Sequence, residues 1–194
     1  MKIAAIVVGI TVVFAALAWI WFLNACEDDW CAVFGWQKAK LVTDFESCVR
    51  FGFGVFLSYP PQCAAGGRTY IQDIGNELEK RDLIRIARPR PGDTVSSPLA
   101  IEGEARGAWF FEASFPAYIF DADGNKLGVT PAEARGEWMT GDFVPFRAVL
   151  EFKRPATERG TLILKKDNPS GLPEHDDELR VPIRFRTPQG SAGH

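Results

Sequence analysis

The chain has 194 residues, a hydrophobic fraction of 46% and a formal net charge of −3 at pH 7. This length allows one domain with a small appendage, and this hydrophobic content is enough to build a core. Residues 24–80 carry eight acidic and five basic side chains, and residues 81–194 carry seventeen acidic and sixteen basic ones. Neither part offers the basic surface that nucleic acids require, so we expect no nucleic-acid partner.

The N-terminal segment predicts a membrane anchor. Ile3–Leu23 comprises 21 residues without a charge, Lys2 precedes it, and an acidic cluster follows from Glu27. A helix of this length spans roughly 30 Å, the thickness of the bilayer hydrocarbon core. We expect residues 1–24 to form an uncleaved transmembrane signal anchor in the cytoplasmic (inner) membrane. The N-terminus would lie inside and the rest in the periplasm or extracytoplasmic space. A cleaved signal peptide and lipidation at Cys26 are the alternatives, and both also export the chain.

The four cysteines, Cys26, Cys31, Cys48 and Cys63, all precede the region richest in strand patterns. An even number in an exported chain favours disulfides. A bridge between Cys48 and Cys63 would close a loop of about fifteen residues and contribute ~3 kcal/mol. Cys26 and Cys31 could form a second bridge. Because no two cysteines have the C-x2-C spacing, we expect no zinc site.

Residues 25–81 are expected to form a small cysteine-containing linker module. From Thr69 the chain reads TYIQDIGNELEKRD, and the spacing of Ile71, Ile74 and Leu78 predicts a short amphipathic helix. The run from Cys63 to Tyr70 resembles the central segment of Kazal-type protease inhibitors. Ile74 stands where that family has a cysteine, so we expect a stapled linker rather than an inhibitor.

Residues 82–187 predict an all-β domain, and residues 188–194 a disordered tail. Apolar alternation predicts strands at residues 81–88, Leu99–Ala105, Phe111–Ile119, 126–129, Phe146–Phe152, Thr161–Lys165 and 180–186. Pro116 predicts a bulge or an edge position, Asp123-Gly124 predicts a hairpin turn, and residues 130–142 predict a connection between sheets. About seven short strands with almost no helix fit an immunoglobulin-like antiparallel β-sandwich, with a small β-barrel as the alternative.

A family resemblance supports this fold. Its motifs occur in the order Pro91–Pro98, Gly103–Gly107, Trp109–Phe115, Trp138–Thr140 and Lys166–Gly171. Together they make residues 84–186 similar to the bacterial spore-germination-associated immunoglobulin-like domain. The resemblance implies an immunoglobulin-like fold and an extracytoplasmic location. It implies no enzyme activity, and it does not by itself assign a germination role to this chain.

Clustered aromatic residues are the main candidates for binding. Trp109, Phe110 and Phe111 are consecutive, so they cannot all face the core from one strand. If exposed, they would make a protein-binding or sugar-stacking patch. If buried, they would cap the open end of the sandwich beneath residues 130–142. The candidate patch comprises Trp109, Phe110, Glu112, Trp138, Met139, Asp167 and Asn168.

Catalytic and metal sites have little support in the sequence. Neither of its two histidines, His175 and His194, has a credible nucleophile for which it could act as a general base. Asp121, Asp123 and Asn125 have the odd-position spacing of a calcium loop, but a hairpin turn explains them better. Residues 174–178 read EHDDE and predict a solvated charged loop. We therefore expect no enzyme activity, no metal and no cofactor.

These observations lead to one principal hypothesis and one alternative. The principal hypothesis is a membrane-anchored extracytoplasmic protein that presents an immunoglobulin-like domain to an unknown protein partner in the bacterial cell envelope. The alternative is a module that binds cell-wall glycan (peptidoglycan) through exposed aromatic rings.

Overall fold

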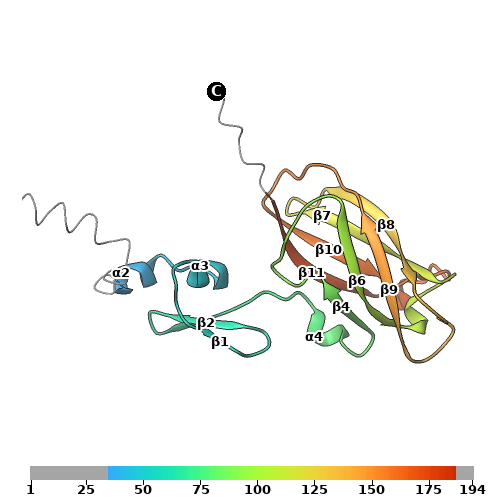
Figure 1. Ribbon diagram of the computed structural model, residues 1–194, viewed down its shortest axis with the longest axis horizontal. Helices are drawn as coiled ribbons and strands as arrows, with labels where there is room; N and C mark the ends of the chain where they lie inside the picture. The colour runs from blue at the N-terminus through green and yellow to red at the C-terminus, as the bar shows by residue number, and fades with distance from the viewer. Residues whose placement is uncertain (1–34, 187–194) are drawn as a thin grey trace, which may run out of the picture. The chain divides into compact units, whose positions relative to one another are not determined.

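The computed structural model describes residues 35–186, and the chain divides into two compact units with the boundary between Ile71 and Gln72 (Figure 1). The expected anchor, the lipidation at Cys26, the Cys26–Cys31 bridge and the C-terminal tail lie outside the described residues. Within residues 35–186, no helix has the length and apolar character that crossing a membrane requires.

The first unit combines two short helices with a three-stranded antiparallel sheet of order β1-β2-β3. Its elements are α2 (Gly35–Lys40), α3 (Phe45–Arg50), β1 (Val55–Phe56), β2 (Gln62–Ala65) and β3 (Arg68–Ile71). Asp44 caps α3, because its carboxylate accepts the N–H of Ser47 at 2.8 Å while the Ser47 hydroxyl accepts the Asp44 N–H. Gly66 and Gly67, both at positive φ, make the tight turn between β2 and β3.

A disulfide between Cys48 and Cys63 joins α3 to β2, as the spacing predicted. Both cysteines are fully buried in a small core with Val42 and Ala65. Half-buried aromatic side chains surround this core, and the hydroxyl of one of them, Tyr70, donates to the Val42 carbonyl at 3.0 Å. The bridge therefore lies at the centre of the unit.

The predicted amphipathic helix from Thr69 is wrong. Residues up to Ile71 belong to β3, and only Glu77–Lys80 form a helix, α4. Ile74 is buried, whereas Ile71 and Leu78 are exposed. Pairing with β2 outweighs a helical spacing that rests on three residues, and Gly75 at a φ of 64° interrupts the segment.

The second unit contains α4 and one eight-stranded sheet of order β4-β6-β9-β8-β7-β10-β11-β5. All neighbouring strands are antiparallel except the pair β5–β11. The strands are β4 (Ile84–Arg88), β5 (Thr94–Val95), β6 (Leu99–Arg106), β7 (Ser114–Asp121), β8 (Lys126–Ala134), β9 (Phe143–Leu150), β10 (Arg159–Lys165) and β11 (Glu178–Phe185). Short 3₁₀ turns occur at η3 (Gly107–Trp109) and η4 (Pro173–His175).

The sheet curls so that its two parts face each other across a shared core (Figure 1). Strand β8 pairs along its length with β7 but with β9 only at Glu133 and Ala134. Phe115 of β7 lies against Phe146 of β9, with ring centroids 4.9 Å apart. This arrangement is β-sandwich-like, and the predicted apolar alternation is confirmed in β7, β9, β10 and β11, where every second residue is buried and the others are half-buried or exposed.

Three local predictions for this unit need correction. The strand expected from Phe111 begins at Ser114, and residues 130–134 continue β8 instead of connecting sheets. Pro116 marks neither an edge nor a bulge, because β7 lies between β8 and β10 and the irregular pairing falls between Ile119 and Phe120. Pro116 lies opposite Pro131, and such a pair is tolerated where neither N–H would join the ladder.

Candidate functional site

Three loops gather at one end of the second unit. They are residues 107–113 between β6 and β7, residues 135–142 between β8 and β9, and residues 166–177 between β10 and β11. The strand registers place them together, because Arg106 pairs with Phe143 and Ser114 pairs with Glu133. We call this region the loop end. It contains all seven residues of the predicted patch.

Backbone contacts pack the three loops together. The N–H of Asp167 donates to the Trp109 carbonyl at 3.1 Å, which joins the third loop to the first. A Cβ on Gly107 would lie 2.0 Å from the Thr140 oxygen and 2.2 Å from the Trp138 oxygen, so only glycine lets the second loop approach this closely. The Arg106 guanidinium adds a 2.9 Å hydrogen bond to the Gly141 carbonyl.

Trp109 and Phe110 are core residues. They are only 2% and 4% exposed, and the Phe110 ring lies 5.2 Å from that of Phe115. Trp138 is half-buried and packs against the same core. The hypothesis of an exposed patch therefore fails for Trp109 and Phe110. Consecutive aromatic residues are both buried here because the chain changes conformation between them: Trp109 ends a 3₁₀ turn, and Phe110 is its extended C-cap residue.

Three large apolar side chains remain exposed at the loop end, one on each loop. Phe111 is 41% exposed, Met139 is 75% exposed and Leu172 is 48% exposed. The predicted residue Glu112 is also exposed. The predicted patch did not include Phe111, although its aromatic run was singled out, and it did not include Leu172. Phe111 is the one member of its aromatic run that points away from the core.

A strained turn presents Phe111 and Glu112. Phe111 and Ser114 exchange two backbone hydrogen bonds of 3.0 and 3.1 Å, which closes a two-residue turn over Glu112 and Ala113. Both turn residues have positive φ, 51° and 61°, a conformation that asparagine and glycine adopt far more readily. Each such residue costs roughly 1 kcal/mol. This strain lies on an exposed loop next to two other loops, a common feature of recognition sites.

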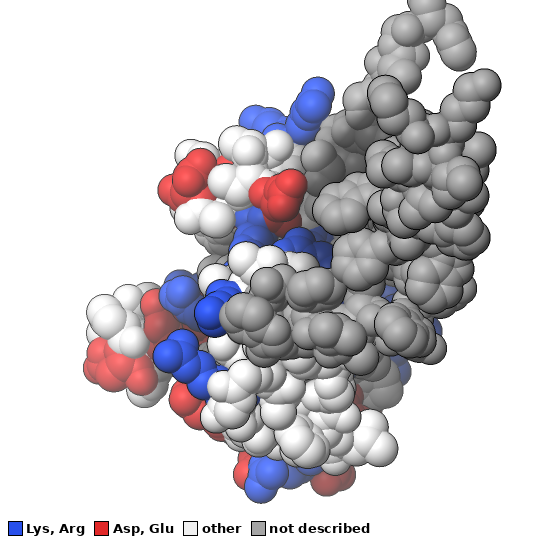
Figure 2. Space-filling view, turned by 90° about the vertical axis from the view of Figure 1, so that its left-hand side faces the viewer, with Lys and Arg blue, Asp and Glu red and all other residues white. Residues whose placement is uncertain are grey.

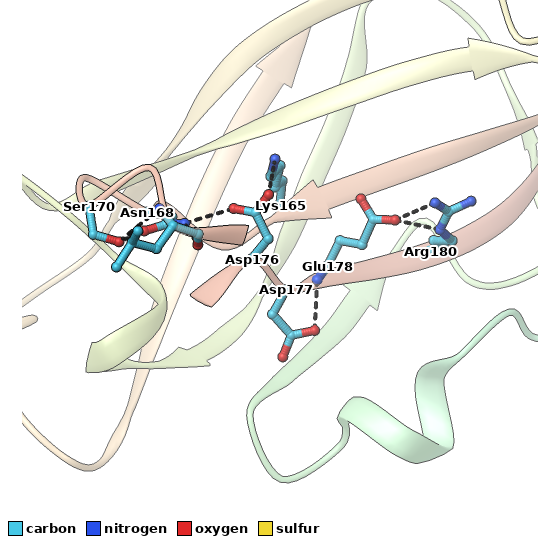
Figure 3. Close-up of polar contacts among 8 residues, drawn as sticks. Lys165, Asn168, Ser170, Asp176, Asp177, Glu178 and Arg180 are labelled. Atoms are coloured by element: carbon cyan, nitrogen blue, oxygen red, sulfur yellow. Dashed lines mark hydrogen bonds and ion pairs between the residues drawn. The ribbon is translucent and has the colours of Figure 1, made fainter. Parts of the chain in front are cut away.

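The third loop is held by its own polar side chains, drawn in Figure 3. The Asn168 amide donates to the Leu172 carbonyl at 2.8 Å and to the Asp176 carboxylate at 2.9 Å, and it accepts the Ser170 hydroxyl at 2.5 Å. The Asn168 amide, followed by Lys165, holds the pKa of Asp176 below its usual value. Asn168 therefore fixes the loop that exposes Leu172, while Asp167 contributes its backbone N–H.

The comparison with known families identifies this unit. Residues 83–171 match the family model of the immunoglobulin-like domain of bacterial spore germination. This part of the chain is an immunoglobulin-like domain of that family. Neither a curated protein nor a solved structure matches the chain.

The matched range runs from the start of β4 into the third loop of the immunoglobulin-like domain. Strand β11 follows the match and pairs with both β10 and β5. The fold thus extends beyond the matched residues, and the third loop of the loop end lies partly outside them.

The acidic clusters of the immunoglobulin-like domain have structural partners. Asp121 Oδ1 accepts the N–H groups of Asp123 and Asn125 at 3.1 and 2.8 Å, and Oδ2 accepts the Asn125 amide at 3.0 Å. The Asn125 amide lowers the pKa of Asp121 more than any other group does. Asp177 pairs with Lys80 at 2.6 Å. Among residues 35–186, no three His, Cys, Asp or Glu side chains converge to hold a metal ion.

The surface charges are mixed in sign. On the face that Figure 2 shows, acidic and basic side chains of the described residues alternate with uncharged ones instead of forming a field of one sign. This face does not offer the basic surface that nucleic acid requires.

Proposed function

We propose that the protein is a non-enzymatic, membrane-anchored extracytoplasmic protein that presents its immunoglobulin-like β-sandwich to a protein partner in the bacterial cell envelope. Residues 3–23 would hold it in the cytoplasmic membrane, and the described residues would lie in the periplasm or extracytoplasmic space. The observation that carries the proposal is the loop end. Its three interlocked loops each expose one large apolar side chain.

This geometry suits protein recognition. Binding costs less free energy when the contacting loops are already ordered, and backbone hydrogen bonds order these loops. Isolated exposed apolar side chains are common, but Phe111, Met139 and Leu172 come from three loops held at one end of a rigid sheet. Apolar and aromatic side chains of this kind are enriched at the centres of protein interfaces. In immunoglobulin-type sandwiches the loops at one end commonly form the binding surface.

The glycan alternative receives less support. Sugar binding by stacking needs an accessible ring face, and Trp109 and Phe110 are almost fully buried. Trp138, the remaining indole of the loop end, is half-buried against the core. Phe111 is the one exposed phenylalanine of the three loops.

Site-specific photocrosslinking in intact membranes tests the proposed contact. A photoreactive amino acid at Leu172 is expected to form an adduct with one defined protein. Met139→Lys should reduce the adduct by about tenfold, because a charge would be buried at the interface. Val129→Lys is the matched control, since Val129 is 50% exposed on β8, and it should leave the adduct unchanged. An adduct insensitive to Met139→Lys would remove the loop end from the proposal.

A reporter fused after His194 tests the membrane arrangement independently. We expect activity from an exported reporter such as alkaline phosphatase and none from a reporter that works only in the cytoplasm. The opposite result would refute the extracytoplasmic location, whatever the crosslinking shows.

A further inference from the structure

The tip of the hairpin formed by β1 and β2 is the most apolar exposed surface of the described residues. We define the hairpin tip as Val55–Tyr59. Leu57 is completely exposed, Phe56 and Tyr59 are 55% and 49% exposed, and Val55 is 44% exposed. The surrounding run Phe51–Gly67 comprises seventeen residues without a charged side chain. Isolated exposed apolar residues are ordinary, but several adjacent ones mark an interaction surface.

The first unit holds this tip firmly. Cys63 lies in β2 directly opposite Val55, and its disulfide to Cys48 ties the hairpin to α3. The Ser58 hydroxyl donates to the Pro60 carbonyl at 2.8 Å and closes the tip on itself. The exposed side chains therefore project from an ordered support. None of them belongs to the small core, which consists of Val42, Cys48, Cys63 and Ala65.

The described residues of the first unit carry a small positive net charge. Residues 35–71 contain the basic side chains Lys38, Lys40, Arg50 and Arg68 against two acidic ones, a net charge of +2. Residues 72–186 contain twenty acidic and seventeen basic side chains, a net charge of −3. The view in Figure 2 includes a continuous stretch of uncharged described surface, with both basic and acidic groups at its margin. Basic and apolar side chains together are typical of segments that lie on anionic lipid.

The length of the chain keeps the first unit near a bilayer if Ile3–Leu23 spans one. Eleven residues separate Leu23 from Gly35, where the described helix α2 begins. Fully extended, they reach at most about 40 Å. Any more compact path brings the unit closer, so the hairpin tip can meet the lipid surface without displacing the anchor.

We infer that the hairpin tip docks on the outer surface of the bilayer that holds the anchor, with Phe56, Leu57 and Tyr59 in the headgroup region. The inference rests on the proposed membrane anchor and adds a second lipid contact to it. Interfacial depth suits the tip, because its loop carbonyls and N–H groups stay within reach of water there. Aromatic side chains such as Phe56 and Tyr59 favour this region. Docking would hold the first unit against the membrane.

The test uses the full chain reconstituted into vesicles of phosphatidylethanolamine and phosphatidylglycerol. A benzophenone amino acid replaces Leu57 in one variant and Met139 in another. Met139 is the matched control, because it is a long apolar side chain, 75% exposed, in the other unit. We expect a lipid adduct by mass spectrometry at residue 57 and at most about a tenth as much at residue 139.

A second variant examines the apolar character of the tip. With the benzophenone moved to residue 56, Leu57→Asp should lower the lipid adduct by about tenfold, because a carboxylate resists entry into the interface. Since Leu57 touches solvent over its whole side chain, this variant should fold, and an intact Cys48–Cys63 bridge on a non-reducing gel checks that it does.

The outcomes separate the docking from the anchor. Equal lipid adducts at residues 57 and 139, or none at residue 57 in vesicle-bound protein, would overturn the docking and leave the anchor intact. An adduct from residue 57 to the same chain or to a second copy would also overturn it. If the full chain does not remain with the vesicles, the anchor in the proposed function fails as well.

Discussion

The two units of this chain are stabilised in different ways. The immunoglobulin-like domain buries 23 apolar residues in one core, and none of them is a cysteine. The first unit buries four, and two of these are the bridged cysteines. With 37 described residues, the first unit is of a size at which a hydrophobic core alone rarely suffices. The disulfide supplies stability that the small buried apolar surface of this unit does not.

The two units also differ in how much of their surface is apolar. Fourteen large apolar side chains are exposed in the described chain, and seven of them belong to the first unit. That unit has less than a third of the described residues. Its apolar surface is therefore concentrated, whereas in the immunoglobulin-like domain it is spread out except at the loop end.

The largest effect is expected from the core of the immunoglobulin-like domain. Phe115→Ala removes a fully buried ring that contacts Phe110 and Phe146, and it should lower the free energy of unfolding by about 3–5 kcal/mol. Hydrogen exchange measured by mass spectrometry should show this loss in residues 84–186 and not in residues 35–71. Val129→Ala, at an exposed position on the neighbouring strand β8, should change stability little. Equal losses in both units would show that they unfold together.

The second effect concerns the bridge. Replacing Cys48 and Cys63 together by serine should cost the first unit about 3 kcal/mol. Hydrogen exchange should then become fast in residues 35–71 and stay slow in the immunoglobulin-like domain. Cys26→Ser with Cys31→Ser is the control, because it leaves the described bridge in place. Slow exchange in residues 35–71 without the bridge would mean that the small core suffices.

The third expected effect is a gain in stability, and it concerns the strained turn of the loop end. Ala113→Gly should raise stability by about 1 kcal/mol, because glycine adopts a φ of 61° without strain. Ala122→Gly is the matched control in the turn after β7. Ala122 is exposed and has an ordinary φ, so glycine there should be neutral or slightly destabilising. If both variants behave alike, the turn at Glu112 and Ala113 stores no strain.

The fourth effect is expected to be the smallest and appears only in acid. Because hydrogen bonds, above all from the Asn125 amide, lower the pKa of Asp121 in the folded state, its charged form stabilises the fold. This contribution is complete above the ordinary value of 3.8 and is lost as the pH falls through the lowered pKa. Asp121→Asn should flatten the dependence of stability on pH below about 4. Urea unfolding followed across this range measures it, and an unchanged slope would exclude Asp121 as its source.

Much of the immunoglobulin-like domain was predictable because its signals are local. The alternation of Phe146, Ala148 and Leu150 follows from the pleat of a single strand, whose period of two is independent of its neighbours. The turn at Asp123-Gly124 needs only the positive φ of Gly124. The predictions were wrong where pairing with a distant segment decides the secondary structure. Ile71 belongs to a strand only because β2 lies beside it.

The candidate site was predictable in place but not in detail. Its residues were identified in the sequence as a cluster of aromatic and polar side chains in loops, and the loops do meet at one end. Which side chains face solvent depended on partners distant in sequence. Trp109 is buried because Asp167, 58 positions later, and the loop around Trp138 close over its turn.

By itself, the sequence determined the apolar alternation of the long strands in the immunoglobulin-like domain, the pairing of Cys48 with Cys63 and the family of residues 83–171. Each of these depends on short-range periodicity, on spacing or on motifs in order. Only the tertiary structure decided that Phe111, Met139 and Leu172 face outward while Trp109 and Phe110 fill the core. Burial is a property of the assembled fold, because the atoms that exclude water from a side chain come from segments that the local sequence does not specify.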